Sequence, residues 1–502
     1  MVGAALLGID LGTTAVKVGL FDVEAGECLV VAWREYEATA PQPGWAELPA
    51  ETYWRATVEA VREACAKARQ PEVLGLGLSS QGQTFVLLDE AQKPLRPAVV
   101  WLDTRAEAEA ERLRQALDPV EYRINMGGVR LSVVDSASKL LWLREHEPEV
   151  WAKTRYVLLL PDYLGLLLTG ERRLDVSGAA STGMVQSREM KWWPAALEAV
   201  GVREEWLSEL GRAGERLGLL RPEAAAELGL PAGLPVALGA MDQLAGAVGV
   251  ANLRPGIVSG TVGTALALVA TVAEVDDPGK LGLLSGPHPA PGLWFLLSYA
   301  KTCAIVLTWL RSLSAPGADY AGLLAEAATV PAGAEGLVCL PHFSGTGTPA
   351  FRSDVRGALL GLKLGHTRGH LIRAVAEAAG WGARDALELM AQAGARPAEV
   401  RMLGGATRSD WWMQTLADIL ELPLVVPACG EAPVLGAALF AGVATGAFAN
   451  LEEAAGRFYR VEREYEPRPE AAEYAAPYGA YRAAMERLYP GALECGHTPE
   501  GG

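Results

Sequence analysis

Cysteine and histidine are scarce in this sequence, and those present form no recognisable disulfide or metal pattern. Among 502 residues there are six cysteines, all far apart and without a CxxC pair, and six histidines. Cysteines spaced in this way are typical of reduced, buried thiols in a cytoplasmic protein rather than of a disulfide framework or a zinc site. His366 and His370 have the i,i+4 spacing of a helical metal pair, but Gly365 and Gly369 flank them and no third ligand stands nearby. We therefore expect a cytoplasmic protein with neither disulfides nor a histidine metal site.

Long hydrophobic runs and an excess of basic residues are also missing. The most apolar stretches, such as YVLLLPDYLGLLLTG, are interrupted by Pro and Asp and indicate buried core rather than membrane spans. No basic segment followed by an apolar run opens the chain, so a signal peptide is not expected. The formal net charge of −16 argues against a nucleic-acid partner, because no basic stripe is available to displace counterions from phosphates. A small soluble molecule is the expected partner, with no nucleic acid and no membrane.

Three common catalytic or nucleotide-binding motifs are absent as well. The sequence has no Walker A GxxxxGK[ST], no GxSxG nucleophile elbow and no dinucleotide-binding GxGxxG. P-loop kinases, α/β-hydrolases and Rossmann enzymes depend on these residues for their chemistry. These three classes are therefore disfavoured.

Two glycine- and threonine-containing hairpins are present, about half a chain apart. The strand-like segment ALLGIDL ends in Asp10 and Leu11, and the chain then turns through Gly12, Thr13 and Thr14 into a second strand. A carboxylate beside such a turn is suited to holding Mg²⁺ and the phosphates of a nucleotide. Either turn alone is also explained as an ordinary β-turn. Because residues 260–264 repeat the pattern between two further strands, we expect two facing hairpins that hold one nucleotide.

The remaining pattern predicts two α/β domains. Strand-like and helix-like segments alternate, and 502 residues are too many for a single core. We place the boundary near Gly249, which gives domains over residues 1–248 and 249–490. The segment VVWLD leaves Asp103 at a strand end, either as a functional carboxylate or as a residue favouring the next helix, for which Thr104–Glu107 has the T-x-x-E form of a capping box. A closing helix and a loose polar tail are expected after Tyr465.

Many segments, in order, resemble the FGGY carbohydrate kinases, which share a duplicated actin-like, ribonuclease H-like fold with other sugar kinases and Hsp70-type ATPases. The resembling segments include GIDLGTTAVK, LSSQGQTFVLLD, PAVVWLDTR, GAMDQLAGAVG, SGTVGT, SGTGTPAFRSDVRGALLGL and MLGGATRSDWWMQTLADIL. Two further sets of residues fit the signature patterns of the family: Lys139, Trp142, Glu145 and His146, with Val134 a departure, and Gly357, Gly361, His370, Ala374 and Glu377, with Ala376 a departure.

The resemblance implies two actin-like domains with an interdomain cleft. Residues 1–248 would form the N-terminal domain, with the sugar site and the first phosphate hairpin. Residues 249–490 would form the C-terminal, ATP-binding domain. Dimers are common in this family, so a homodimer is possible.

The resemblance also assigns roles in catalysis and ATP binding. Asp242, in the segment GAMDQ, would be the base that takes the proton from the attacking hydroxyl, and a buried Asp in this apolar run needs such a reason. Asp10 would help to hold Mg²⁺ through water. The phosphates of ATP would meet Thr13, Thr14 and Lys17 from one hairpin, and Gly263 and Thr264 from the other. The adenosine would pack on the glycine turn of Gly404, Gly405 and Ala406, with Ser409 where relatives often have Asn.

The substrate residues depart from the known patterns of the family. The resemblance places Gln81, Gly82, Gln83, Asp103, Asp242 and Gln243 around the sugar. Glycerol kinases have Arg-Glu, and xylulokinases Met-His, where Gly82 and Gln83 stand here, so the bidentate grip of an Arg on glycerol is missing. Gln243 follows the base as in glycerol kinases, whereas WLDTR is nearer to xylulokinases. We rank a pentulose such as D-xylulose first, an erythritol-type polyol or another ketose second, and glycerol third.

Two other classes of function are disfavoured relative to a kinase. An actin-like ATPase acting as a conformational switch, such as an Hsp70-type chaperone, would need a peptide-binding domain, and the stretch after Tyr465 is too short for one. A sugar-binding regulator with a dead kinase fold would be expected to lose the base or a phosphate hairpin, and both are present. The sequence therefore predicts ATP-dependent phosphorylation of a hydroxyl on a small sugar or polyol.

Overall fold

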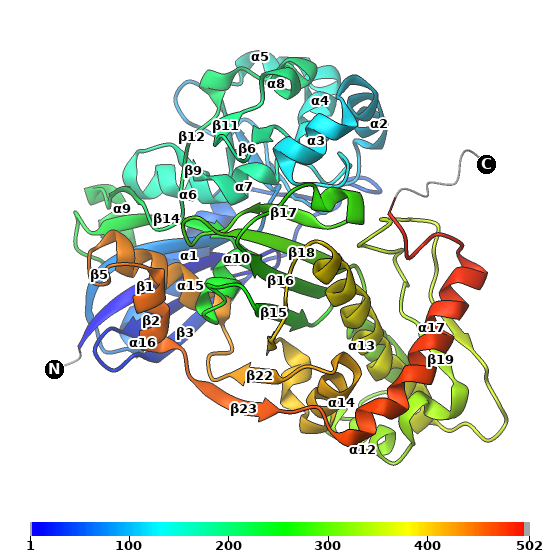
Figure 1. Cartoon of the computed structure of the whole chain (residues 1–502). Coiled ribbons are helices and arrows are strands. Elements are labelled where there is room, and N and C mark those ends of the chain that lie inside the picture. Colours follow the sequence, from blue (N-terminus) through cyan, green and yellow to red (C-terminus); the bar gives the residue numbers. More distant parts are fainter. Residues whose placement is uncertain (1–2, 496–502) are drawn as a thin grey trace. The chain divides into compact units, whose positions relative to one another are not determined.

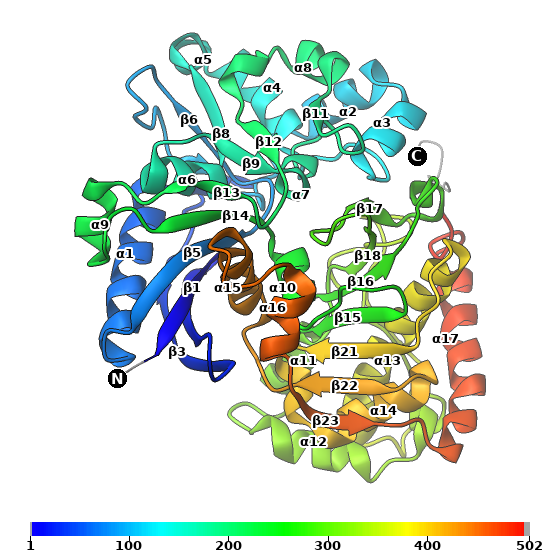
Figure 2. The same ribbon diagram turned by 60° about the vertical axis from the view of Figure 1, so that its left-hand side comes forward.

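A computed structural model describes residues 3–495 of the chain and divides it into two compact units. Unit 1 comprises Met1–Leu253, Gly286–Leu293 and Glu431–Tyr459. Unit 2 comprises Arg254–Ser285, Trp294–Gly430 and Arg460–Gly502. Figures 1 and 2 follow the course of the chain through both units.

Unit 1 is built on a six-stranded sheet in the order β13-β14-β5-β1-β2-β3. Its strands are β1 (Ala4–Leu11), β2 (Ala15–Asp22), β3 (Glu27–Glu35), β5 (Glu72–Ser80), β13 (Arg216–Leu219) and β14 (Pro235–Met241). The first three form an antiparallel meander, and β1 pairs in parallel with β5, which pairs in parallel with β14. Strand β1 is almost entirely buried, as expected for a central strand covered on both faces.

Unit 2 repeats this plan in a sheet of order β17-β18-β16-β15-β21-β22-β23. The strands are β15 (Ile257–Val262), β16 (Leu266–Val272), β17 (Leu284–Pro287), β18 (Trp294–Ala300), β21 (Glu399–Leu403), β22 (Leu424–Pro427) and β23 (Val461–Tyr465). Here β15, β16 and β18 form the antiparallel meander, and β15 pairs in parallel with β21, which pairs in parallel with β22. The turns between β1 and β2 and between β15 and β16 therefore occupy equivalent places in two copies of one architecture.

The helices of unit 1 cover this sheet and carry an additional subdomain. They are α1 (Ala50–Lys67), α6 (Leu160–Thr169), α7 (Val176–Ala180), α9 (Pro222–Leu228), α10 (Asp242–Gly249), α15 (Ala432–Ala444) and α16 (Leu451–Phe458) around the sheet, with α2 (Glu107–Ala116), α3 (Pro119–Met126), α4 (Ser136–His146), α5 (Pro148–Lys153) and α8 (Pro194–Val200) in the subdomain. A second sheet joins β4 (Glu47–Leu48), β7 (Ala98–Val99), β6 (Phe85–Leu88) and β8 (Tyr156–Leu159). The subdomain has its own apolar core, built mainly from residues 85–207.

The helices of unit 2 are α11 (Ile305–Ser314), α12 (Tyr320–Ala328), α13 (Arg368–Gln392), α14 (Asp410–Leu420) and α17 (Ala475–Leu488). The short strands elsewhere in the chain are β9 (Arg173–Asp175), β10 (Val185–Gln186), β11 (Lys191–Trp192), β12 (Glu209–Gly211), β19 (Val338–Leu340) and β20 (Ala358–Leu360). Helix α17 is the closing helix predicted after Tyr465, and the end of the expected polar tail, from residue 496 on, lies outside the described residues. In the stretch from residue 3 to 495, every helix is too short or too polar to cross a membrane.

Helix α15 packs against the sheet of unit 1, although the sequence placed its residues within the domain 249–490. A Cβ atom on Gly8 would lie 2.0 Å from the carbonyl oxygen of Val434, and one on Gly77 would lie 1.8 Å from that of Ala437. The helix is apolar on all sides and must be buried, and the glycines of β1 and β5 let its backbone approach the sheet closely. The compact units are therefore not consecutive halves of the chain. The division into domains over residues 1–248 and 249–490 stays a prediction.

The predicted capping box at Thr104–Glu107 is wrong. Helix α2 begins at Glu107, its N-cap is Ala106, and no side chain caps it. The hydroxyl of Thr104 instead donates to the carbonyl oxygen of Gly44 at 3.2 Å. Thr104, just before α2, therefore bonds to the segment around Gly44 instead of capping the helix.

Candidate active site

The carboxylate of Asp10 lies near the end of β1, where two neighbouring strands supply polar partners. Asp10 pairs across the ladder with Lys17 on β2 and with Ser79 on β5, and the Ser79 hydroxyl donates to its Oδ1 at 2.7 Å. Burial raises the pKa of Asp10, while the hydrogen bond from Ser79 and the charge of Lys17 act in the opposite direction. Asp10 is thus an almost buried acid held in a defined position.

The turn after Asp10 is fixed through one carbonyl group. The oxygen of Gly12 accepts hydrogen bonds from the Tyr36 hydroxyl at 2.5 Å and from Nε2 of Gln81 at 3.1 Å. In the described part of the chain, the backbone N–H groups of Thr13 and Thr14 donate to no protein atom. Two fixed, unused N–H groups beside a carboxylate form the kind of concavity that accepts a phosphate.

The side chains of the same turn have different partners. The hydroxyl oxygen of Thr13 accepts a hydrogen bond from the indole N–H of Trp101 at 2.8 Å. Thr14 is exposed. Nζ of Lys17 lies 2.6 Å from Oε2 of Glu431, the residue immediately before α15. The structure therefore brings Asp10, Thr13, Thr14 and Lys17 together at one end of the sheet of unit 1.

Asp242 is the first residue of α10 and directly follows β14, at the same end of the sheet. Its Oδ1 accepts a hydrogen bond from the backbone N–H of Gln243 at 2.7 Å. Loss of solvation and the nearby charge of Asp10 raise the pKa of Asp242 to about 7. An acid with this pKa exchanges a proton near neutral pH, as a general base requires.

The loop after β5 is where the resemblance places the sugar. Nε2 of Gln81 donates to the carbonyl oxygen of Gly12, and the residue is only 4% exposed. A Cβ atom on Gly82 would lie 3.0 Å from both Cβ and Oγ of Ser181, so this position has little room for a side chain. Gln83 adopts φ +59°, and its backbone is held by the hydroxyls of Ser181 and Ser136.

The side-chain amides of Gln83 and Gln243 have no hydrogen-bond partner among residues 3–495, and the buried Oε1 of Gln81 has none there either. Gln83 and Gln243 are both partly exposed. An amide offers both a donor and an acceptor to a sugar hydroxyl. These two side chains are therefore available for a polar ligand, whereas in Gln81 only the buried Oε1 is left without a partner.

The carboxylate of Asp103 is fully buried and already saturated. Its oxygens accept hydrogen bonds from the side chain of Arg105 at 2.9 and 2.7 Å and from the backbone N–H of Ala46 at 2.6 Å. Arg105 also bonds to Glu47 and stacks over the ring of Trp45. Asp103 is therefore part of a structural hydrogen-bond network. Its contact with the sugar stays a prediction, because both of its oxygens already accept hydrogen bonds.

In unit 2 the predicted nucleotide residues lie at the ends of β15 and β21. Gly404 adopts φ +92°, and a Cβ atom there would lie 2.6 Å from the carbonyl oxygen of Val262, so the glycine turn lies against the β15–β16 hairpin. Gly405 and Gly263 differ, because a Cβ atom on either would meet nothing within 4 Å. Ser409 is the N-cap of α14 and accepts from the backbone N–H of Trp412. Thr264 is exposed and Ala406 is buried.

Several residues of the site were not predicted. Ser79, Tyr36 and Ser181 could have been proposed only after the strands were aligned in register, because nothing in their local sequence marks them. Trp101 lies within the family-like segment WLDTR but carried no assigned role. Glu431 is 414 residues away from Lys17 in the sequence and has no local signal.

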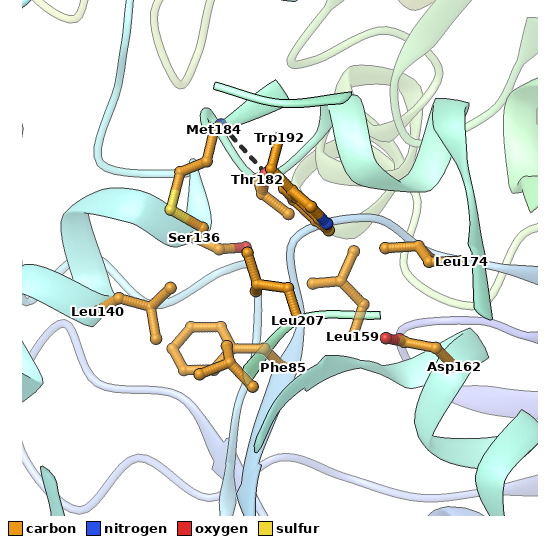
Figure 3. A pocket seen from close by; sticks show the side chains of 11 residues that line it. Phe85, Ser136, Leu140, Leu159, Asp162, Leu174, Thr182, Met184, Trp192 and Leu207 are labelled. Atoms are coloured by element: carbon orange, nitrogen blue, oxygen red, sulfur yellow. Dashed lines mark hydrogen bonds between the residues drawn. The ribbon is translucent and has the colours of Figure 1, made fainter. Parts of the chain in front are cut away.

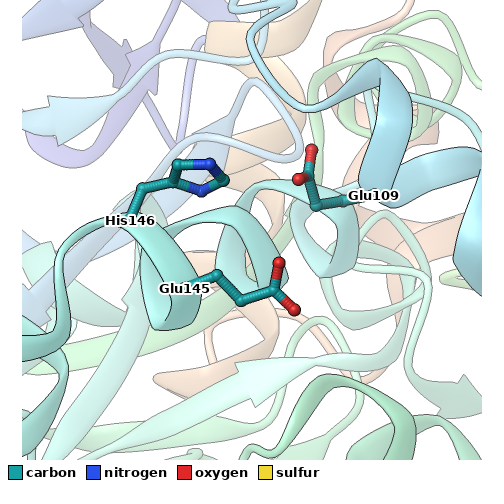
Figure 4. A group of neighbouring side chains, drawn as sticks. All are labelled: Glu109, Glu145 and His146. Atoms are coloured by element: carbon teal, nitrogen blue, oxygen red, sulfur yellow. The ribbon is translucent and has the colours of Figure 1, made fainter.

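Two other clusters of residues in unit 1 resemble sites. Glu109, Glu145 and His146 are the single group of potential metal ligands found among the described residues (Figure 4), but Arg112 neutralises Glu145 through two hydrogen bonds. A pocket lined by Phe85, Leu140 and Asp162 lies in the subdomain of unit 1 (Figure 3). Its interior volume is about 10 Å³ once the width of a water molecule is allowed for, enough for one water. Neither cluster is a sugar site.

Comparison with known proteins defines the class of enzyme. The models of the N-terminal and C-terminal domains of the FGGY family of carbohydrate kinases match residues 5–249 and 256–445. The chain belongs to this family. It is therefore an ATP-dependent carbohydrate kinase, and its duplicated sheets are those of two actin-like domains.

Individual relatives are similar over nearly their whole length. Xylulose kinase of Escherichia coli (strain K12) is 32% identical over 484 residues, covering 96% of this chain and 98% of the relative. Glycerol kinase 2 of Streptomyces avermitilis is 32% identical over 505 residues, covering 96% of each. The crystal structure of xylulose kinase from Rhodospirillum rubrum superposes with a TM-score of 0.90 at 30% identity, covering 97% of this chain and 99% of that one.

Proposed function

We propose that this kinase transfers the γ-phosphoryl group of ATP to a hydroxyl of a pentulose such as D-xylulose, with Mg²⁺ as the metal. The observation that carries the proposal is the pairing of two acids at one end of the sheet of unit 1. Asp242 has a pKa near 7 because of burial and the charge of Asp10. One acid suited to proton transfer beside another suited to a cation is what phosphoryl transfer to an alcohol requires.

The proposed roles follow from which groups are free. Asp242 would accept the proton of the attacking hydroxyl and orient that hydroxyl. Asp10, oriented by Ser79, would hold Mg²⁺, which when bound neutralises charge on the phosphates. The unused N–H groups of Thr13 and Thr14 and the ammonium of Lys17 would bind phosphate oxygens.

Unit 2 would bind the rest of the nucleotide. Gly263 and Thr264 would contact phosphates, and the turn of Gly404, Gly405 and Ala406 would pack against adenosine. The open space around Gly263 and Gly405 supports this assignment, since the fold itself does not need glycine at either position. The hydroxyl oxygen of Ser409 accepts the capping bond of α14, so its hydrogen is left to donate to the nucleotide.

The choice of a pentulose rests on the relatives and on the loop after β5. The relatives include proteins named xylulose kinase, glycerol kinase and autoinducer-2 kinase, so the family alone leaves the sugar open. Gln83 and Gln243 would bind sugar hydroxyls through their free amides. Gly82 supplies no charged group, which disfavours glycerol. Because Gly82 and Gln83 are both neutral, an erythritol-type polyol or another ketose is the second candidate.

The catalytic assignment is tested with Asp242→Asn. We expect phosphorylation to fall by about 10² to 10⁴-fold, because the base is lost, while the affinity for Mg-ADP stays nearly unchanged in isothermal titration calorimetry. The control is Asp118→Asn, because Asp118 is an exposed N-cap residue and Asn caps equally well. A variant of Asp242 that keeps more than about a tenth of the wild-type kcat would overturn the role of base.

The sugar is tested by measuring ADP release with pentuloses, tetritols, hexonates and glycerol. D-Xylulose or another pentulose is expected to give the highest kcat/KM. Glycerol as the best substrate would contradict the interpretation of Gly82 and Gln83. A tetritol as the best substrate would replace the first candidate with the second.

We also propose a cytoplasmic homodimer. Cys28, Cys65, Cys303 and Cys339 are free thiols, which fits a reducing compartment. Sedimentation equilibrium measures the oligomeric state, and cell fractionation measures the location. A monomer, or a secreted protein, would contradict this part of the proposal.

A further inference from the structure

Trp101 connects three separate parts of unit 1 through all three of its polar groups. Its backbone N–H donates to the hydroxyl of Thr84 at 3.0 Å, and its carbonyl oxygen accepts from Nζ of Lys139 at 3.1 Å. Its indole N–H donates to the hydroxyl oxygen of Thr13 at 2.8 Å. Thr84 follows the sugar loop, Lys139 lies on α4, and Thr13 lies in the β1–β2 turn.

Lys139 is an unusual residue to find in such a position, because its side chain is fully buried. Burial lowers the pKa of Lys139 to about 8, and the charges of Asp103 and Asp135 oppose this shift. A buried ammonium group is costly unless it is hydrogen-bonded and paired. The hydrogen bond from Lys139 therefore holds the backbone of Trp101 against α4.

The bond between Trp101 and Thr13 determines what the Thr13 hydroxyl can do. An indole N–H is only a donor, so the hydroxyl oxygen of Thr13 must accept this bond. The hydroxyl hydrogen is then left to donate to a different acceptor. Hydrogen bonds in such a chain strengthen one another, which makes the hydroxyl a better donor. The acceptor expected beside the N–H groups of Thr13 and Thr14 is a phosphate oxygen.

We propose that Trp101 is a positioning residue that orients the Thr13 hydroxyl toward the phosphates of ATP, and that Lys139 and Thr84 hold Trp101 in place. This inference rests on the proposed function of the β1–β2 turn as a phosphate site. It assigns a role to Lys139, a signature-like residue without a place in the catalytic mechanism. It also links the sugar loop to the phosphate turn through one residue, whose backbone N–H bonds to Thr84 and whose indole N–H bonds to Thr13.

The test is a double-mutant cycle of Trp101→Phe and Thr13→Val. Phe keeps an aromatic ring but lacks the N–H and part of the ring volume, and Val keeps the shape of Thr without the hydroxyl. We expect Trp101→Phe to lower kcat/KM for ATP by about 5- to 20-fold in the wild-type background, the loss of one hydrogen bond to a group that binds charge. In the Thr13→Val background the same change should cost less than about twofold, because the coupled hydroxyl is gone.

A merely structural role would give a different pattern. Trp101→Phe would then lower activity by the same factor in both backgrounds, and that additive result would overturn the inference. If Trp101→Phe also changes KM for the sugar by the same factor in both backgrounds, that change does not belong to the coupling between Trp101 and Thr13. Trp151→Phe is the control for loss of ring volume, since Trp151 packs against Trp206 in the same unit. We expect it to leave kcat/KM for ATP unchanged.

The same cycle can be measured without any sugar. Isothermal titration calorimetry with Mg²⁺ and a non-hydrolysable ATP analogue gives the affinity of each of the four proteins. Coupled losses of affinity would support the inference even if no pentulose is phosphorylated, in which case only the proposed substrate fails. Wild-type protein that binds no nucleotide would overturn both the inference and the proposed function.

Discussion

Lys17 and Glu431 form an ion pair with Nζ and Oε2 2.6 Å apart. Lys17 lies on β2 beside the phosphate turn, and Glu431 stands where the chain enters α15. Both side chains remain partly exposed, at 40% and 38%. The ammonium group proposed to bind ATP is therefore shared with a carboxylate that repels phosphate.

Replacing Glu431 with Gln should strengthen ATP binding. The carboxylate competes with phosphate for Lys17, and exposed ion pairs of this kind contribute up to about 1 kcal/mol. We expect Glu431→Gln to lower KM for ATP by up to about fivefold with little change in kcat. Glu452→Gln, at an exposed acid of α16 in the same unit, is the control and should change nothing. A higher KM for ATP in Glu431→Gln would mean that Glu431 holds Lys17 in its working position.

The activity should depend on pH through Asp242. A base must be ionised to accept a proton, and the pKa of Asp242 is raised to about 7. We expect kcat/KM for the sugar to rise about tenfold per pH unit below this pKa and to level off above it. Mg-ADP affinity measured over the same range serves as the reference, because it does not need the base. A rate that stays flat from pH 5.5 to 8 would contradict the raised pKa.

Gly404 and Gly405 should respond differently to alanine. Gly404→Ala places a Cβ atom 2.6 Å from the carbonyl oxygen of Val262 at a positive φ, so the melting temperature should fall by several degrees. Gly405→Ala meets nothing within 4 Å and should keep the wild-type melting temperature. If adenosine packs on Gly405, this variant should still raise KM for ATP. Gly405→Ala with unchanged stability and unchanged KM would remove Gly405 from the proposed adenosine site.

Asp162, which lines the small pocket in Figure 3, should make the fold less stable as the pH rises. Burial raises its pKa to about 7, and one of its oxygens has no hydrogen-bond partner. The folded state therefore keeps a proton that the unfolded chain releases above about pH 4, so stability declines between about pH 4 and 7 and stays low above that range. Asp162→Asn should show a smaller drop in melting temperature from pH 5 to pH 8 than the wild type. An equal drop in both proteins would show that the ionisation of Asp162 carries no cost.

The sequence predicts the local features of the site well because they depend on neighbouring residues. The turn at Gly12 and its counterpart at Gly263 each depend on a short pattern, and the structure has a turn between two strands at each. Side-chain directions are harder to predict. The sequence did not predict that Nε2 of Gln81 bonds to Gly12, because the parallel pairing of β5 with β1 brings that carbonyl within reach.

Long-range packing could not be predicted from local patterns. Thr104 and Glu107 have the spacing of a capping box, but the buried network of Asp103 and Arg105 determines how the chain leaves the strand. The pair formed by Lys17 and Glu431 depends on where α15 packs. The position of α15 is set by its contacts with glycines in β1 and β5, which lie hundreds of residues earlier in the sequence.

The return of residues 431–459 to unit 1 means that this enzyme cannot be divided by a single cut. A fragment ending at Leu253 would leave Gly8 and Gly77 facing solvent along a bare apolar surface. Such a surface favours aggregation over independent folding. Expression of two separate halves, or an exchange of halves with a relative, would have to carry α15 and α16 along with the N-terminal part.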